Sequence, residues 1–196
     1  KKIISSIDFG KVYSIRSMVG QYLPDWHPNE DYSKGYSANK HLGGGVLLDL
    51  THEIDFTYSL LGDFIDYKSF FGKLSSINSD SEDLAEIIIK FKKHNAIGSI
   101  RLDYIQKFPQ RSGQIIGENQ TLFYNLLNSK IEVFDKNGLT YSNHLENFDR
   151  NDMYLSQMKY LIKNVNEKKF IENDFESGLK ILKLVNDVKD DNGWTY

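Results

Sequence analysis

The sequence contains no cysteine and only three prolines. Without cysteine, disulfide bonds and cysteine-ligated metal sites are excluded, which fits a reducing compartment, and we expect a cytoplasmic protein. No apolar run reaches the roughly 18 residues of a transmembrane helix. The formal net charge of −3 lacks the basic excess that nucleic-acid binding usually requires. Neither a membrane nor a nucleic acid is therefore an expected partner.

Length and composition fit one globular domain. The chain has 196 residues, of which 40% are hydrophobic and 26% are charged, so we expect a single domain over 1–196. The chain begins with Lys1 rather than methionine, and residues 1–7 are basic and then apolar. We interpret residues 1–7 as the remnant of a preceding helix in a longer protein.

Aromatic residues are abundant, at 13% of the chain. Aromatic side chains favour β-strands, so one interpretation is a sheet with a well-packed face. The alternative is a carbohydrate-binding surface, where rings stack on sugars and tyrosine hydroxyls donate hydrogen bonds. Composition alone favours the packed sheet.

Hydrophobic periodicity and turn residues divide the chain into elements. Residues 23–42 hold two of the three prolines and many small polar residues, which predicts a long loop. Apolar residues at intervals of three and four predict a helix that Gly62 ends. The members of this stripe are Leu47, Leu50, Ile54, Tyr58 and Leu61. The expected elements are helices over 46–61, 152–167 and 174–190 and strands over 11–22, 64–74, 83–93, 95–107, 109–118, 120–126 and 130–134.

The order of these elements predicts the fold class. Short turns join most of the strands, so neighbouring strands should pair antiparallel. The strands form a run and the helices are segregated from it, which predicts an α+β fold with a largely antiparallel open sheet and helices packed on one face. The other face would then be available to a partner or a ligand.

The segment 43–55 holds the best candidates for chemistry, because three glycines open the predicted helix. Glycines at a helix start leave backbone N–H groups available to an anionic or hydroxyl-rich ligand. At about 100° per residue, Asp49 and His52 lie within one turn of each other, and Asp55 follows within another. A histidine beside a carboxylate is suited to general acid–base chemistry. The simpler interpretation is a solvated polar helix face, which the pattern alone favours.

Other kinds of site find little support. No metal is expected, because no second histidine lies at a ligand spacing from His52. The remaining histidines are scattered in predicted loops and turns; they are His27, His41, His94 and His144. No glycine-rich dinucleotide turn follows a predicted strand, and no P-loop or serine-hydrolase motif occurs. We therefore expect no cofactor-binding residues within this chain.

The segment 43–62 resembles the signature of the Gfo/Idh/MocA oxidoreductase family, which opens the substrate pocket of that family's C-terminal domain. The matching residues are Gly43-Gly44-Gly45, Asp49, His52, Asp55 and Leu60-Leu61-Gly62, and the flanks 7–12, 114–118 and 192–194 agree with the family more loosely. The resemblance implies a C-terminal domain of the glyceraldehyde-3-phosphate-dehydrogenase-like type. The loop over 20–38 is similar to a subgroup linked to surface-polysaccharide and nucleotide-sugar pathways.

The resemblance implies hydride transfer between a sugar carbon and NAD or NADP, which an N-terminal Rossmann domain outside this chain would hold. It makes His52 the acid–base residue and lets Asp49 orient His52 or bind substrate hydroxyls. Substrate-binding roles fall to Gly44, Gly45, Asp55, Tyr22, Trp26 and Tyr32. For the three aromatics, which are candidates to stack on a sugar or base, packing of the loop on the core is an equal alternative.

One departure affects these assignments. His52 follows Asp49 by three residues where the family commonly has four, and one residue turns a helix by about 100°, so His52 is the firmer assignment. Without the Rossmann domain and its lysine, the chain alone should be inactive. The resemblance also suggests a homo-oligomer formed through the open sheet face. Two alternatives stay open: a stand-alone sugar-binding or scaffold domain, and an unrelated α+β domain with a coincidental glycine-rich helix start.

Overall fold

An eight-stranded sheet forms the body of the protein, with strand order β2-β3-β4-β1-β5-β6-β7-β8. The computed structural model describes residues 1–6, 8–26, 28–146, 149–169 and 174–191. Neighbouring strands pair antiparallel, except that β1 and β4 run parallel. This sheet confirms the predicted α+β fold. The strands are β1 (Val12–Gly20), β2 (Phe64–Gly72), β3 (Leu84–Phe91), β4 (Ile97–Asp103), β5 (Gln110–Gly117), β6 (Thr121–Asn125), β7 (Lys130–Asp135) and β8 (Gly138–His144).

The first strand lies in the interior of the sheet. β1 pairs with β4 on one side and with β5 on the other. A parallel pair cannot be joined by a tight turn, and the chain between β1 and β4 includes the long loop, two helices and two strands. Strands β4 and β5 are not neighbours, although the connection between them is short, because β1 lies between them.

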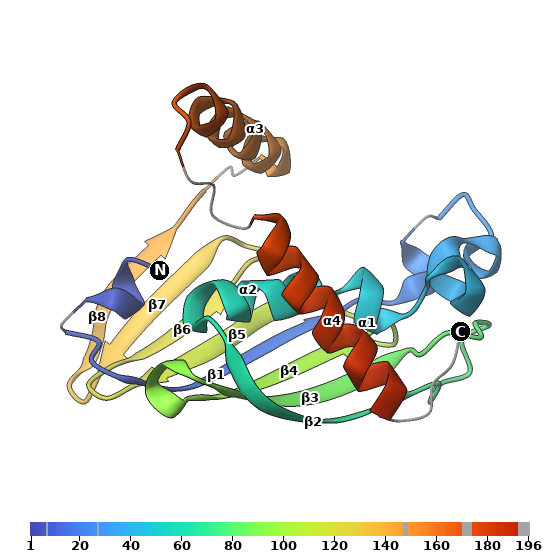
Figure 1. Ribbon diagram of the computed structural model, residues 1–196, viewed down its shortest axis with the longest axis horizontal. Coiled ribbons are helices and arrows are strands. Elements are labelled where there is room, and N and C mark those ends of the chain that lie inside the picture. Colours follow the sequence, from blue (N-terminus) through green and yellow to red (C-terminus); the bar gives the residue numbers. More distant parts are fainter. Residues whose placement is uncertain (7, 27, 147–148, 170–173, 192–196) are drawn as a thin grey trace.

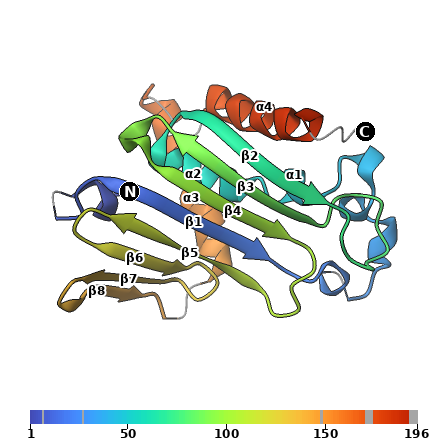
Figure 2. The same ribbon diagram turned by 90° about the horizontal axis from the view of Figure 1, so that it is seen from below.

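Three helices cover one face of the sheet, and Figures 1 and 2 show the other face uncovered. These helices are α1 (Val46–Asp49), α2 (His52–Leu61) and α4 (Phe175–Asp191). Side-chain contacts attach α4 at both ends: Lys180 Nζ lies 2.8 Å from Asp63 Oδ1, and the Tyr67 hydroxyl donates a hydrogen bond of 2.6 Å to Asp191. None of the described helices is both long and apolar enough to cross a membrane.

The hydrophobic core lies between the sheet and these three helices. Alternate residues of the central strands point into it, because successive side chains of a strand face opposite sides. Ile87, Ile89, Ile100 and Leu102 are buried in this way. Four of the five residues in the stripe over 46–61 are buried with them, namely Leu47, Leu50, Ile54 and Leu61. Burial of each such side chain contributes roughly 1.5–3 kcal/mol.

Helix α3 (Arg150–Asn166) differs from the other helices, because it stands clear of the sheet (Figure 1). Six of its apolar residues form one stripe at helical spacing, and they are between 40% and 58% exposed. This α3 stripe consists of Tyr154, Leu155, Met158, Leu161, Ile162 and Val165. No described residue of this chain covers it.

Three local differences separate the observed elements from the expected ones. The helix over 46–61 is interrupted at Leu50 and Thr51, where the Leu50 backbone (φ −106°, ψ 17°) is not helical. Strand β8 was not expected, although the Asn137-Gly138 turn implies a returning strand. The loop over 23–42 contains four short 3-10 turns. The expectations that involve Ile7, His27 and 192–194 lie outside the described residues.

Candidate active site

The glycine run 43–45 is a tightly bonded turn. The N–H groups of Gly44 and Gly45 donate to the carbonyls of Asn39 and Ser37, at 3.1 and 3.2 Å, and Gly43 donates to Lys40. The next two N–H groups, of Val46 and Leu47, are bonded to Glu82. The prediction that this helix start leaves N–H groups free for a ligand is therefore wrong, because the chain's own loops occupy them.

Glycine is needed at 44 and 45 because of close packing. A Cβ atom on Gly44 would lie 2.1 Å from the Tyr36 carbonyl oxygen, and one on Gly45 would lie 2.3 Å from the Glu82 carboxylate. Gly45 also has φ 112°, which favours glycine. Glu82 is fully buried, and its Oε1 lies 3.2 Å from Nζ of Lys189, which is buried on α4. Burial raises the pKa of Glu82, against the opposing effect of Lys189.

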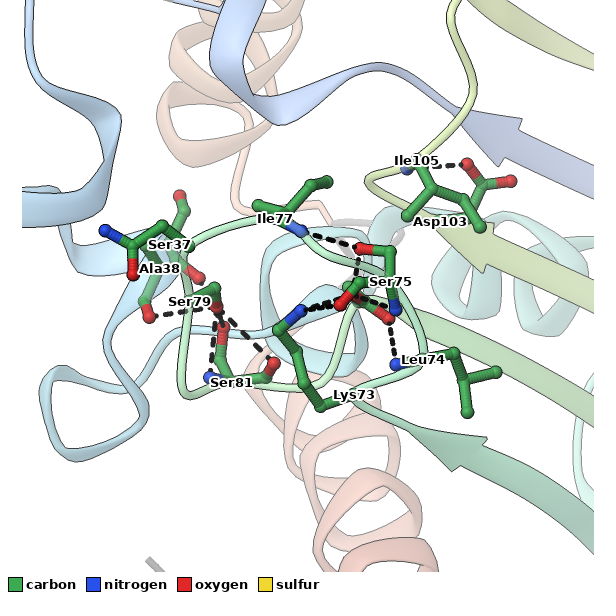
Figure 3. A network of polar contacts seen from close by, with 12 residues as sticks. Ser37, Ala38, Lys73, Leu74, Ser75, Ile77, Ser79, Ser81, Asp103 and Ile105 are labelled. Atoms are coloured by element: carbon green, nitrogen blue, oxygen red, sulfur yellow. Dashed lines mark hydrogen bonds and ion pairs between the residues drawn. The ribbon is translucent and has the colours of Figure 1, made fainter.

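The loop over 73–81 supports this turn from its other side. Ser81 and Ser79 donate hydrogen bonds of 2.7 and 2.9 Å to the carbonyls of Ser37 and Ala38, and Figure 3 shows these side chains grouped together. Asp83 holds the start of the same loop by accepting from the N–H groups of Leu74 and Ser75. These bonds connect the loop over 73–81 to the backbone around Gly44 and Gly45.

Asp49 accepts a hydrogen bond from a buried tyrosine. The Tyr104 hydroxyl donates a hydrogen bond of 2.5 Å to Asp49 Oδ2. Tyr104 is fully buried, and both its burial and the Asp49 charge raise the pKa of its hydroxyl, so it acts as a neutral donor. Trp26 packs edge-to-face on Tyr104 with ring centroids 5.3 Å apart. Asp49 thus has a defined orientation at the end of α1.

His52 begins α2, directly after the interruption of the helix. Thr51 Oγ1 donates to the Leu48 carbonyl at 2.8 Å within this break. Asp49 and His52 therefore belong to two separate helices and are not related by the regular 100° turn per residue. His52 Nε2 lies 3.5 Å from Oε1 of Glu53, and the His52 side chain is 41% exposed. The carboxylate next to His52 therefore comes from the adjacent residue, which sequence analysis did not single out.

Glu53 is the centre of a buried polar cluster. Its Oε1 accepts from Arg111 Nε at 2.5 Å, and its Oε2 accepts from Ser17 Oγ at 2.5 Å. The Tyr124 hydroxyl donates to Ser17 Oγ at 2.8 Å. Ser17, Gly113 and Tyr124 lie side by side on β1, β5 and β6, and a Cβ atom on Gly113 would lie 2.3 Å from the Tyr124 hydroxyl. A glycine at this position lets the tyrosine reach across β5.

None of the four polar members of this Glu53 cluster was predicted from the sequence; they are Ser17, Glu53, Arg111 and Tyr124. They are separated by up to 107 residues in the sequence. One sequence signal for the cluster was available: Glu53 lies in the predicted helix directly before Ile54, a member of the apolar stripe. A carboxylate on a buried helix face needs a cation and hydrogen-bond donors from elsewhere in the fold.

The remaining candidates lie around this region. Asp55 is half-buried, and burial raises its pKa. Tyr22, Trp26 and Tyr32 are packed against the core; the Tyr32 hydroxyl accepts from the Asn78 N–H at 3.1 Å, and Lys107 Nζ lies 2.9 Å from the centre of the Tyr22 ring. These contacts pack the three aromatic residues of the loop against the rest of the protein. Their stacking on a ligand stays a prediction.

Known proteins resemble this chain in sequence pattern and in fold. A family model described as "GFO/IDH/MocA C-terminal domain" matches residues 1–123. No curated protein sequence matches at a significant level. Levoglucosan dehydrogenase in complex with NADH is 15% identical with a TM-score of 0.85, and the match covers 97% of this chain and 59% of that one.

Two further solved structures share the fold. A UDP-N-acetylglucosamine 3-dehydrogenase, GnnA, from Acidithiobacillus ferrooxidans is 13% identical (TM-score 0.70), with 95% of this chain and 55% of that chain covered. An oxidoreductase from Agrobacterium radiobacter, in complex with NAD+, L-tartaric acid and magnesium, is 19% identical (TM-score 0.76), with 95% and 56% covered. This chain thus spans less than two thirds of each of these proteins.

The family match covers more than half of the chain, including the glycine run, Asp49, His52 and three members of the Glu53 cluster, and it ends one residue before Tyr124. It rules out the alternative of an unrelated α+β domain. The protein belongs to the GFO/IDH/MocA family, as a C-terminal domain of that family.

Proposed function

We propose that this chain is the substrate-binding and dimerisation domain of an NAD(P)-dependent oxidoreductase that acts on a CH–OH group of a sugar or nucleotide sugar. The single observation that carries the proposal is His52, which is partly exposed at the start of α2 and held beside the buried Glu53 carboxylate. The family match supports it. Solved relatives of the same fold include a levoglucosan dehydrogenase bound to NADH and levoglucosan and a UDP-N-acetylglucosamine 3-dehydrogenase.

We infer that the cofactor binds outside this chain. Dinucleotides bind where a strand runs through a glycine turn into a helix whose first N–H groups contact the phosphates. Among the described residues, the glycine run follows a 3-10 turn instead, and its N–H groups are bonded to the chain itself. The proposal therefore assigns the cofactor, and the hydride chemistry it supplies, to a Rossmann domain of a longer protein. This chain alone is expected to bind sugar without turnover, and we place the whole protein in the cytoplasm.

The residues of this chain would bind the sugar and move its hydroxyl proton. His52 is the proposed acid–base group, because it is exposed and held by a carboxylate. Asp49, held by Tyr104, and Asp55 are proposed to accept hydrogen bonds from sugar hydroxyls. Gly44 and Gly45 would hold the backbone beside the sugar, and Tyr22, Trp26 and Tyr32 would border it. No metal is part of the proposal.

The test replaces His52 by alanine in the longer protein that contains this chain. With levoglucosan and UDP-N-acetylglucosamine as probe substrates, we expect kcat, measured by NADH formation, to fall about 10²–10⁴-fold. The His144→Ala variant, on the exposed strand β8, is the matched control and should keep full activity. An unchanged kcat for His52→Ala would contradict the assignment of His52. Sugar binding with no turnover by the wild-type protein would instead favour a stand-alone sugar-binding domain.

The uncovered α3 stripe supports the existence of a further domain. Apolar stripes of this width usually pack against another element, and we propose that the Rossmann domain covers this one. Leu161→Asn should then change the free energy of unfolding of this chain by less than about 0.5 kcal/mol, and should destabilise the longer protein by more than about 1 kcal/mol. Lys159→Gln, on the polar side of α3, is the control. Equal effects of Leu161→Asn in both proteins would exclude this contact.

The open sheet face is the proposed dimer surface. Ile88, Ile97 and Phe123 point outward on this face and are between 43% and 52% exposed. Scattered apolar residues among charged ones fit a contact between two copies. Phe123→Asp should convert a dimer into a monomer in light scattering, whereas Leu74→Asp, in an exposed loop, should not. A monomeric wild-type protein would refute the dimer.

A further inference from the structure

Arg111 and His52 meet on one oxygen atom of Glu53. Arg111 Nε lies 2.5 Å, and His52 Nε2 lies 3.5 Å, from Glu53 Oε1. Ser17 occupies the second carboxylate oxygen. Glu53 is fully buried, so it places both side chains on a fixed point of the fold rather than on a mobile surface group.

Arg111 makes only part of the contact that a guanidinium can make. It lies on β5 opposite the inward-facing Val19, on the helix-covered side of the sheet. Its ion pair with Glu53 uses Nε, and the side chain is 30% exposed. Within the described part of the chain, no other residue accepts from the two terminal nitrogens. A permanently charged, planar pair of donors is thus available beside His52.

Neutralising Glu53 does not explain this arrangement. A single cation at Oε1 is enough to balance the carboxylate, whereas arginine has a rigid fork that matches carboxylate and phosphate oxygens in pairs. Because the Arg111–Glu53 pair is formally neutral, it attracts anions by directed hydrogen bonds at short range and not by a broad positive field. Such an arrangement distinguishes ligands by where their anionic group lies.

We propose that Arg111 is a specificity-determining residue, whose terminal nitrogens bind a carboxylate or phosphate group of the sugar substrate beside the hydroxyl that His52 serves. That the ligand is a sugar rests on the proposed function. That it carries an anionic group rests on the geometry of Arg111 at Glu53. It narrows the substrate class from sugars in general to anionic sugars. The carboxylate would belong to a sugar acid, and the phosphate to a sugar phosphate or nucleotide sugar.

The experiment follows the Arg111 Nε–H resonance of this chain by NMR while one of four probes is added. The probes are glucuronate, glucose 1-phosphate, glucose and inorganic phosphate. We expect one or both sugar anions to shift the resonance and to bind at least tenfold more tightly than glucose and inorganic phosphate. Glucuronate alone would identify a sugar acid, and glucose 1-phosphate alone a phosphorylated sugar.

Variants assign the binding to this side chain. Arg111→Gln should weaken binding of the preferred anion about 10- to 100-fold, the range for a hydrogen bond to a charged group, and should leave glucose binding unchanged. Arg16→Gln is the matched control, because Arg16 is exposed on the opposite face of β1. If Arg111→Gln fails to fold with Glu53 unpaired, the Glu53→Gln/Arg111→Gln double variant removes both charges and gives the same test.

The inference would be overturned by no shift with either sugar anion, by equal affinity for glucose, or by an equal loss in Arg16→Gln. Inorganic phosphate binding as tightly as the sugar anions would overturn it as well, because the site would then not recognise a sugar. The proposed function is tested separately by turnover of the wild-type longer protein and by its loss in His52→Ala. Anion binding by this chain with no sugar turnover by the wild-type longer protein would refute only the function, and wild-type turnover without anion binding would refute only this inference.

Discussion

Lys189 and Glu82 form an ion pair that is buried on both sides: Nζ and Oε1 are 3.2 Å apart, and the side chains are 1% and 0% exposed. The pair joins α4, near the end of the described chain, to the residue that bonds the N–H groups of Val46 and Leu47. The last helix is thereby connected to the glycine run of the candidate active site.

Breaking this pair should be costly. Lys189→Met leaves a buried carboxylate uncompensated, and we expect the free energy of unfolding to fall by about 3–5 kcal/mol in urea denaturation. The Glu82→Gln/Lys189→Met double variant, which removes both charges, should be more stable than Lys189→Met alone. Lys183→Met, on an exposed position of α4, is the control. Additive losses in the double variant would contradict the coupling.

Asp83 should make the protein sensitive to acid. Burial alone would raise its pKa, but hydrogen bonds from Leu74, Ser75 and Lys73 outweigh burial and hold the pKa below the usual 3.8. The folded state then binds this proton less tightly than the unfolded state, so the stabilisation is complete above pH 3.8 and is lost as the pH falls below it.

Asp83→Asn tests this dependence. An amide places a donor against the N–H groups of Leu74 and Ser75, so we expect a loss of about 2–4 kcal/mol at pH 7. The difference from wild type should shrink below pH 3.8, as measured by urea denaturation at a series of pH values. Asp135→Asn, in the exposed hairpin turn, serves as the reference. A difference that stays constant down to low pH would exclude a role for the Asp83 charge.

Gly44→Ala should destabilise the glycine run. Its Cβ would meet the backbone oxygen of Tyr36 at 2.1 Å, and a backbone atom cannot rotate away. We expect a loss of at least about 2 kcal/mol in thermal or urea unfolding. Gly178→Ala, in α4 with open space around it, should instead gain about 0.5–1 kcal/mol. A neutral Gly44→Ala would mean that the turn relaxes easily.

Tyr124→Phe should weaken the Glu53 cluster from a distance. The variant removes the hydroxyl that donates to Ser17, which in turn donates to Glu53. We expect a loss of about 0.5–1.5 kcal/mol of unfolding free energy. Tyr141→Phe, on the exposed β8, should have no effect. If the two variants behave alike, the Tyr124 hydroxyl does not contribute to the stability of the cluster.

Local sequence signals predicted most elements and part of the site. Alternation predicted seven of the eight strands, and the apolar stripe from Leu47 to Leu61 predicted a helix that is buried along that side. The glycine run was recognised as a special segment, but its role was misjudged. The positions of Ser37 and Glu82, which occupy its N–H groups, depend on contacts between separate loops.

The sequence by itself determined the class of fold and the family, because alternation, helical periodicity and the 43–62 motif act over a few residues. Only the tertiary structure decided that β1 lies between β4 and β5, that α3 is left uncovered, and that Glu53 rather than Asp55 is the carboxylate beside Nε2 of His52. The physical reason is that a buried charge must find its partners wherever the fold brings them. For Glu53 these partners are Ser17 and Arg111, far away in the sequence and adjacent only across the folded sheet.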